Sequence, residues 1–75
     1  MIKLYTTNSC PWCVKAKSYL RSQGMDFQEL NVQDDMSARE EMVKKSRQMG
    51  VPVLDINGTV IIGFDKGAID KALGL

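Results

Sequence analysis

Cys10 and Cys13 are the only cysteines of this chain, and they stand three positions apart where a strand-like run meets a helical one. Residues 2–6 alternate with a period of two, which predicts a β-strand with one side facing a core. Pro11 then favours a helix that begins there, because proline lacks the N–H that the first helical position leaves unpaired and its φ is already helical. We therefore expect Cys10 to be the N-cap of a helix that runs to Gly24.

A helical projection separates the two cysteines. It places Cys13 on one stripe with Ala16 and Leu20, flanked by Trp12 and Tyr19. Cys10, in contrast, stands at the open end of the helix. The spacing therefore predicts that Cys10 is accessible and that Cys13 lies at the edge of the packed face.

The middle of the chain predicts a second strand and a second helix. Residues 27–32 are a strand candidate in which Leu30 and Val32 share a face. Ser37 and Glu40 then match a capping box, in which each residue satisfies a free backbone donor of the other, so a helix should start there. The apolar stripe expected on this helix consists of Met42, Val43 and Met49.

The last part of the chain predicts a hairpin and a third helix. Asn57 and Gly58 separate two apolar runs, residues 53–56 and 59–62, and Asn-Gly is the strongest short-range hairpin signal because both turn residues tolerate positive φ. Asp65 can cap a final helix whose apolar stripe docks on the sheet. That stripe consists of Ala68, Ile69, Ala72 and Leu73.

The element order is thus βαβαββα in one domain that spans residues 1–75, with no internal repeat and no linker. Two β-α units followed by a hairpin and a helix imply an α/β fold with a mixed four-stranded sheet. Its first half should be parallel and its last pair of strands antiparallel. The three helices should cover both of its faces.

Charge and composition exclude several classes of partner. Ten Lys and Arg nearly balance nine Asp and Glu, which gives a net charge of +1, and the basic residues are spread along the chain rather than clustered. Neither a nucleic acid nor a membrane surface is therefore expected as a partner. No apolar run approaches the roughly 20 residues of a membrane span, and the N-terminal residues lack the pattern of a signal peptide. We therefore expect a cytoplasmic protein, in a compartment where structural disulfides are rare.

In that compartment, a Cys-x-x-Cys motif that follows a strand and opens a helix indicates redox chemistry. A helix N-terminus carries unpaired N–H donors and roughly half a positive charge, both of which favour a thiolate. Such a placement can lower a cysteine pKa from about 8.5 to roughly 3.5–7.5. Cys10 is therefore predicted to attack a substrate disulfide, and Cys13 to resolve the resulting mixed disulfide.

Other roles for the cysteine pair stay open. Two buried cysteines can be purely structural. A zinc site is disfavoured, because structural zinc takes four ligands and the chain has two cysteines and no histidine. A non-enzymatic alternative is an iron–sulfur or metal carrier that dimerises through Cys10, with external thiols completing four ligands.

Trp12 and Pro52 each have two interpretations. Trp12 is either an exposed aromatic on the helix surface or a platform for a substrate. Pro52 either stops the preceding helix or forms a cis peptide bond that lets Val51 pair with the main chain of a substrate. The methionines at 36, 42 and 49 are interpreted as core and surface filler, and the basic run at 44–47 as a solvated face.

With the cysteine motif, Val51–Pro52 and the segment 63–65, the chain resembles a glutaredoxin over essentially its whole length. The resemblance implies a thioredoxin-like fold, a cis Pro52, and dithiol oxidoreductase activity with Cys10 as nucleophile. It also implies glutathione as a co-substrate, with no bound cofactor and no metal. Gln48 would lie near the glycyl carboxylate of glutathione. The full set of implied substrate-binding residues is Pro11, Trp12, Gln48, Val51, Pro52, Gly63, Phe64 and Asp65.

Three positions depart from the glutaredoxin pattern. Thr7 replaces a frequent lysine, Ile62 replaces the first glycine of a Gly-Gly pair, and Lys66 replaces a frequent acid. A missing cation weakens one charge-assisted contact to a carboxylate, worth about 1.5–3 kcal/mol if well formed. Residues 62–64 also resemble the small redoxins that reduce ribonucleotide reductase and are recharged by thioredoxin reductase. We therefore expect a monomer that acts on disulfide-containing proteins, with glutathione or thioredoxin reductase as its electron source.

Overall fold

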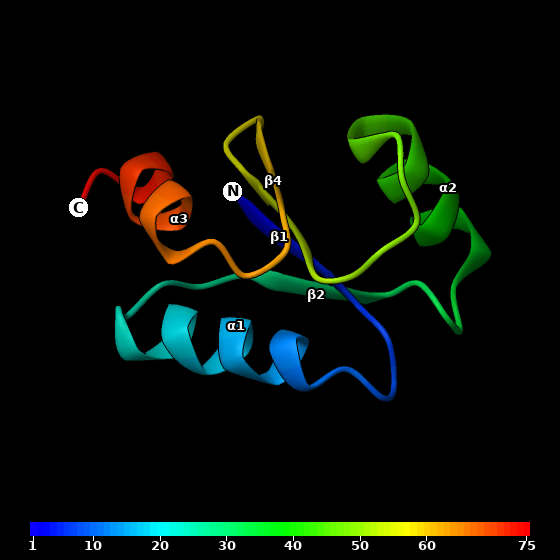
Figure 1. The fold of residues 1–75 in the computed structure, drawn as a ribbon, viewed down its shortest axis with the longest axis horizontal. Helices are drawn as coiled ribbons and strands as arrows, with labels where there is room; N and C mark the ends of the chain where they lie inside the picture. Colours follow the sequence, from blue (N-terminus) through cyan, green and yellow to red (C-terminus); the bar gives the residue numbers. More distant parts are fainter.

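The computed structural model of residues 1–75 contains the predicted elements in the predicted order (Figure 1). They are β1 (Ile2–Thr6), α1 (Pro11–Ser22), β2 (Gln28–Asn31), α2 (Met36–Ser46), β3 (Val53–Ile56), β4 (Thr59–Ile62) and α3 (Lys66–Leu73). None of the three helices combines the length and the apolar character needed to cross a membrane.

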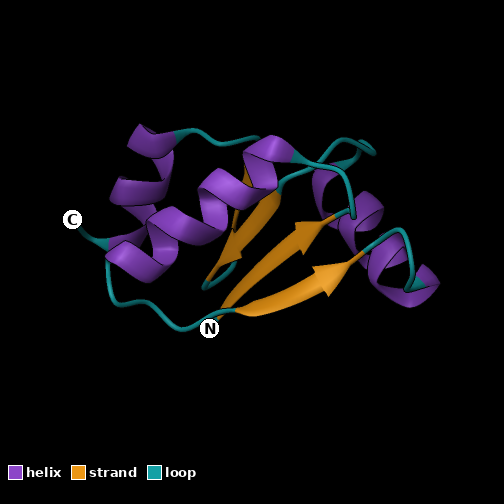
Figure 2. Cartoon of the chain, turned by 90° about the horizontal axis from the view of Figure 1, so that it is seen from below, coloured by secondary structure: helices purple, strands orange, loops and turns teal.

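The sheet has the strand order β2-β1-β3-β4, which confirms the predicted mixed topology. β1 and β2 pair in parallel and are joined by α1, whereas β3 is antiparallel to both of its neighbours. The apolar contacts place α1 and α3 on one face of the sheet and α2 on the other. Figure 2 shows α1 and α3 next to each other, with α2 lying apart from both.

Two apolar clusters fill the two faces. The cluster under α1 and α3 contains Ile2, Leu4, Ala16, Leu20, Leu54, Ile56, Ile61 and Ile69. The cluster under α2 contains Tyr5, Val32, Ala38, Met42 and Val53. β1 therefore contributes to both, and neither Leu4 nor Tyr5 has exposed surface. The prediction of a single core-facing side was wrong for β1, because helices on both faces bury a central strand whatever its alternation.

The hairpin and the last helix form as predicted. Asn57 and Gly58 have φ of +52° and +96°, and the strands they join pair Val53 with Ile62. Asp65 is the N-cap of α3, and its Oδ1 accepts the N–H of Ala68 at 3.1 Å. The predicted stripe of α3 packs on the larger cluster, which confirms how this helix docks.

α2 begins earlier than predicted. Its N-cap is Asp35, whose Oδ1 accepts the N–H of Ala38 at 3.1 Å, and Ser37 lies inside the helix. Aspartate and serine are comparable N-caps, so the local sequence does not choose between them. At the other end, Arg47 adopts a left-handed conformation with φ of +59° and ends the helix. Met49 consequently lies beyond α2 and is 58% exposed, so it is not part of the predicted stripe.

A network of charged side chains ties α2 to the sheet. Lys45 Nζ lies 2.6 Å from Asp55 Oδ2 in β3 and 3.1 Å from Glu41 Oε1. It also donates to the hydroxyl of Tyr5 at 3.0 Å, and Lys3 Nζ lies 2.8 Å from Glu41. The hydrogen bond from Lys3, together with the one from Lys45, outweighs desolvation and lowers the pKa of Glu41 to about 2. The run of positive charge at 44–47 suggested a solvated basic face, but the ammonium of Lys45 is engaged in this network.

Candidate active site

Cys10 caps α1, as the position of Pro11 predicts. Its backbone is extended, with φ of −139° and ψ of 96°, and its carbonyl accepts the N–H of Val14 at 3.2 Å. Its Sγ accepts the N–H of Cys13 at 3.1 Å. The first turn of α1 carries no acidic side chain. The Cys10 sulfur thus meets the positive end of a helix with no negative charge in that turn, which favours a thiolate.

The predicted difference between the two cysteines is also confirmed. They form a disulfide with their Cα atoms 5.2 Å apart. Cys13 is 1% exposed and lies on the buried side of α1, whereas Cys10 is partly exposed. A reactant from solvent can therefore approach Cys10 but not Cys13. No group of three or more Cys, Asp or Glu side chains is placed to hold a metal ion.

Beside the cysteines lies a cavity of about 250 Å³, which we call the groove. Its lining residues come from the start of α1, the segment before β3 and the segment after β4. They are Trp12, Val51, Pro52, Gly63 and Phe64. The fold thus brings together five residues that the sequence analysis singled out from distant parts of the chain. Pro11, also singled out, lies exposed at the start of α1 beside Cys10.

Two backbone features shape the groove. The Val51–Pro52 peptide bond is cis, as the resemblance implies, and the Pro52 carbonyl accepts the N–H of Gly63 at 2.8 Å. Gly63 has φ of +79°, a left-handed conformation in which a larger side chain would be strained. Neither the N–H nor the carbonyl of Val51 takes part in a backbone hydrogen bond. Both groups are therefore open to pairing with an extended segment.

One wall of the groove is aromatic. Trp12 is 55% exposed and stacks on Phe64, with ring centroids 6.2 Å apart and 28° between the ring planes. Lys15 Nζ lies 4.8 Å from the centroid of the Trp12 ring. The wall therefore offers a flat apolar surface with one cation held against it.

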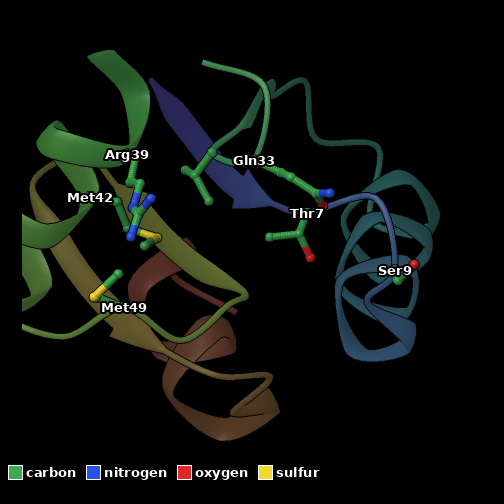
Figure 3. Close-up of a pocket in the computed structure, with 7 residues that line it drawn as sticks. Thr7, Ser9, Gln33, Arg39, Met42 and Met49 are labelled. Carbon is green, nitrogen blue, oxygen red and sulfur yellow. The ribbon is translucent and has the colours of Figure 1, made fainter. Parts of the chain in front are cut away.

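A larger cavity of about 410 Å³ opens next to Ser9, the residue before Cys10 (Figure 3). We call it the Arg39 cavity, because Arg39 is its only charged lining residue. Figure 3 shows the Arg39 side chain reaching from α2 toward the methionines of this cavity. The complete lining is Thr7, Ser9, Val32, Gln33, Arg39, Met42 and Met49.

No sequence motif marked Arg39 as a site residue. The available signal was its spacing, since Arg39 precedes the buried Met42 by three positions and residues three apart on a helix share a face. The charged end of a basic side chain on the packed side of a helix needs access to solvent, and Arg39 finds it in the cavity beside Ser9.

Gln48 and Asp65 line neither cavity. The amide of Gln48 is bound to its own loop, because its Nε2 donates to the Gly50 carbonyl at 3.0 Å and its Oε1 accepts the Gly50 N–H at 2.6 Å. Asp65 is exposed and uses one carboxylate oxygen to cap α3. The structure therefore leaves Asp65 beside the groove, next to Phe64 in the chain, but keeps the Gln48 side chain within its loop.

Comparisons with known proteins agree with this geometry. The Glutaredoxin family model matches residues 2–61. The chain is 55% identical over 73 residues to an uncharacterized glutaredoxin-like 8.6 kDa protein in the rubredoxin operon of Clostridium pasteurianum, covering 97% of each chain. It is 41% identical over 75 residues to glutaredoxin 3 of Escherichia coli K12, covering 99% of this chain and 90% of that protein.

Solved structures give the same result. The fold superimposes on Methanosarcina acetivorans methanoredoxin with a TM-score of 0.89 at 28% identity, covering 99% of this chain and 84% of that one. The family model, the relatives and the fold thus agree, and the chain belongs to the glutaredoxin family.

Proposed function

We propose that this chain is a dithiol–disulfide oxidoreductase that reduces protein disulfides and mixed disulfides with glutathione. The observation that carries the proposal is the arrangement of the two sulfurs. Cys10 Sγ accepts the Cys13 N–H at 3.1 Å at the open end of α1, while Cys13 is 1% exposed. The first feature supports a nucleophilic thiolate, and the second supports a thiol that reacts only with a partner already joined to Cys10.

In the proposed reaction, the Cys10 thiolate attacks one sulfur of a substrate disulfide and expels the other as a thiolate, which takes up a proton. Cys10 and the substrate are then joined by a mixed disulfide. Cys13 loses its proton and attacks Cys10 Sγ, so that the remaining substrate sulfur leaves with the bonding electron pair. The products are a reduced substrate and the Cys10–Cys13 disulfide, which a two-electron donor reopens.

The groove supports the binding of an extended substrate segment. Val51 has an unpaired backbone N–H and carbonyl, and Trp12 and Phe64 form an apolar wall. A segment that adds as a strand gains main-chain hydrogen bonds from Val51 and side-chain contacts from the wall. We therefore assign Val51 to main-chain pairing, with Pro52 and Gly63 setting its position.

The Arg39 cavity supports a place for the glycyl carboxylate of glutathione. Thr7, where many glutaredoxins carry a lysine, lines this cavity, and the positive charge comes instead from Arg39 on α2. Gln48 was the residue expected there, but its amide is occupied by Gly50. Arg39 is therefore assigned the contact with the carboxylate.

Replacing Arg39 tests this assignment. Arg39→Gln is expected to raise the KM for glutathione about 10- to 100-fold, the range that corresponds to one charge-assisted hydrogen bond. Lys44→Gln, on the exposed side of the same helix, is the matched control and should leave the KM unchanged. Equal KM values in the two variants would contradict the role of Arg39.

The experiment that tests the proposed function supplies the oxidised protein with one of two complete electron sources. One contains glutathione, glutathione reductase and NADPH, and the other contains thioredoxin reductase and NADPH. Thiol recovery and NADPH oxidation with the glutathione system support the proposal. Turnover with thioredoxin reductase alone would support instead a redoxin of the kind that serves ribonucleotide reductase. Failure of both systems to restore the thiols would refute an oxidoreductase of either kind.

A further inference from the structure

Tyr19 lies outside both cavities, yet it contacts a residue that lines the groove. It stands seven positions after Trp12 on α1, so the two rings project from the same side of the helix. Its ring meets Phe64 edge-on, with centroids 5.9 Å apart and 70° between the planes. Phe64 therefore contacts two aromatic rings of α1, that of Trp12 in the groove and that of Tyr19 two turns further along the helix.

The position of Tyr19 is itself held from α3. Its hydroxyl donates a hydrogen bond to Asp70 Oδ1, and Lys66 Nζ lies 3.0 Å from Asp70 Oδ2. Lys66 Nζ also lies 5.1 Å from the centroid of the Tyr19 ring. Only Asp65 separates Phe64 from α3, so the same contacts that join α1 to α3 also confine the segment that carries Phe64.

The charge of Lys66 is used within this arrangement. Lys66 stands where an acid is frequent in glutaredoxins. In the structure its ammonium pairs with Asp70 and lies against Tyr19. The ammonium of Lys66 is therefore engaged on α3 by Asp70 and Tyr19, and Lys66 does not line the groove.

We propose that Tyr19 and Asp70 are positioning residues that hold Phe64 against Trp12 and thereby set the shape of the groove wall that receives the substrate. This inference rests on the proposed function, because it assigns these residues to the recognition of the molecule that Cys10 attacks. Neither residue touches the reacting sulfurs. Their removal should weaken substrate binding and leave the chemical step unchanged.

The test compares four variants with the wild type. Tyr19→Leu removes the ring, Tyr19→Phe and Asp70→Asn each weaken the link between α1 and α3 while keeping the ring, and Lys71→Gln is the control on the exposed side of α3. We expect Tyr19→Leu to raise the KM for a disulfide peptide about 3- to 10-fold, the range that corresponds to one aromatic pair, with kcat within about twofold. The two milder variants should raise the KM by about twofold, and the control should not change it.

A second readout does not depend on activity. Trp12 is the only tryptophan of the chain, so its fluorescence reports directly on its stacking with Phe64. We expect a shifted emission in Tyr19→Leu, a smaller shift in Tyr19→Phe and none in Lys71→Gln, with circular dichroism confirming that each variant is folded.

The two readouts separate failure of this inference from failure of the proposed function. If the wild type reduces no disulfide, the proposed function fails, and the emission still decides whether Tyr19 holds the stack. Unchanged emission in a folded Tyr19→Leu protein would overturn the positioning role. So would a shifted emission with an unchanged KM, or a loss confined to kcat, in an active wild-type background. Where Tyr19→Leu does not fold, the same criteria apply to Tyr19→Phe.

Discussion

The two faces of the sheet are stabilised in different ways. Under α1 and α3, eight buried apolar residues form the larger cluster, and the cysteine pair stands at the start of α1 above it. Under α2, five buried residues form the smaller cluster. Beside it, a network links α2 to the sheet and consists of Lys3, Glu41, Lys45, Asp55 and the hydroxyl of Tyr5. The face that carries the cysteine pair therefore has the larger apolar cluster, with the Lys66–Asp70 pair on its helices, whereas the α2 face combines a smaller cluster with a larger charged network. The two faces should respond differently to mutation and to pH.

The largest effect is expected at the cysteines. Cys10→Ser should abolish disulfide reduction, because the attacking thiolate is gone. Cys13→Ser should keep part of the turnover on glutathionylated substrates, since a second glutathione can resolve the mixed disulfide in its place. Turnover of a glutathionylated peptide and of a dithiol substrate measures both. Full dithiol activity in Cys10→Ser would contradict the proposed mechanism.

A large loss of stability is expected when the core under α1 is truncated. Leu20 has no exposed surface, so Leu20→Ala should lower the free energy of unfolding by about 2–5 kcal/mol. Val14, on the same helix, is 57% exposed, and Val14→Ala should change the free energy of unfolding by less than about 0.5 kcal/mol. Urea unfolding at neutral pH measures the difference. Similar losses in the two variants would contradict the view that apolar packing holds this face.

A smaller effect is expected from acid, and Glu41 on the α2 face should contribute to it. The pKa of Glu41 falls from 4.5 to about 2 in the folded protein, so the unfolded chain binds a proton more readily between these values. The stability that Glu41 contributes is therefore complete above about pH 4.5 and is lost as the pH falls toward 2. We expect a contribution of about 1–2 kcal/mol, reduced by solvent screening because the Glu41 side chain is 35% exposed.

Comparing the wild type with Glu41→Gln isolates the contribution of Glu41 to the free energy of unfolding. Unfolding in urea at several values between pH 7 and pH 2.5 should give a wild-type curve that converges on the curve of the variant as the pH falls. Parallel curves would show that the network does not account for the pH response of this face.

The smallest effect concerns the start of α2. Asp35→Ala removes the observed N-cap and should cost about 1 kcal/mol, whereas Ser37→Ala should cost less than about 0.5 kcal/mol because Ser37 lies inside the helix. Thermal unfolding of the two single variants distinguishes them. A larger loss in Ser37→Ala than in Asp35→Ala would instead support Ser37 as the N-cap, as the sequence predicted.

Much of the fold could be predicted because its signals are local. Pro11 after Cys10, the Asn57–Gly58 turn and the Asp65 cap each act on a few neighbouring residues, and each forms in the structure as expected. The start of α2 shows where local signals end. Asp35 and Ser37 are both good caps, and only the packed helix shows which one is used.

The site was predictable to the extent that it follows from backbone positions. Trp12, Val51 and Pro52 could be marked from the sequence itself and Gly63 and Phe64 from the resemblance to glutaredoxins, and the fold brings their three segments together. Arg39 and the loop-bound amide of Gln48 were not predictable, because which side chain reaches a cavity depends on helix rotation and on local hydrogen bonds.

The sequence by itself determined the order of the elements, the mixed sheet, and the unequal exposure of Cys10 and Cys13, because each depends on periodicity or on spacing within one element. Tertiary structure alone decided the burial of Tyr5, the cation supplied by Arg39, and the contact of Tyr19 with Phe64. The physical reason is distance along the chain. Tyr19 and Asp70 are 51 positions apart, and no local pattern marks two such side chains as partners until the helices that carry them pack together.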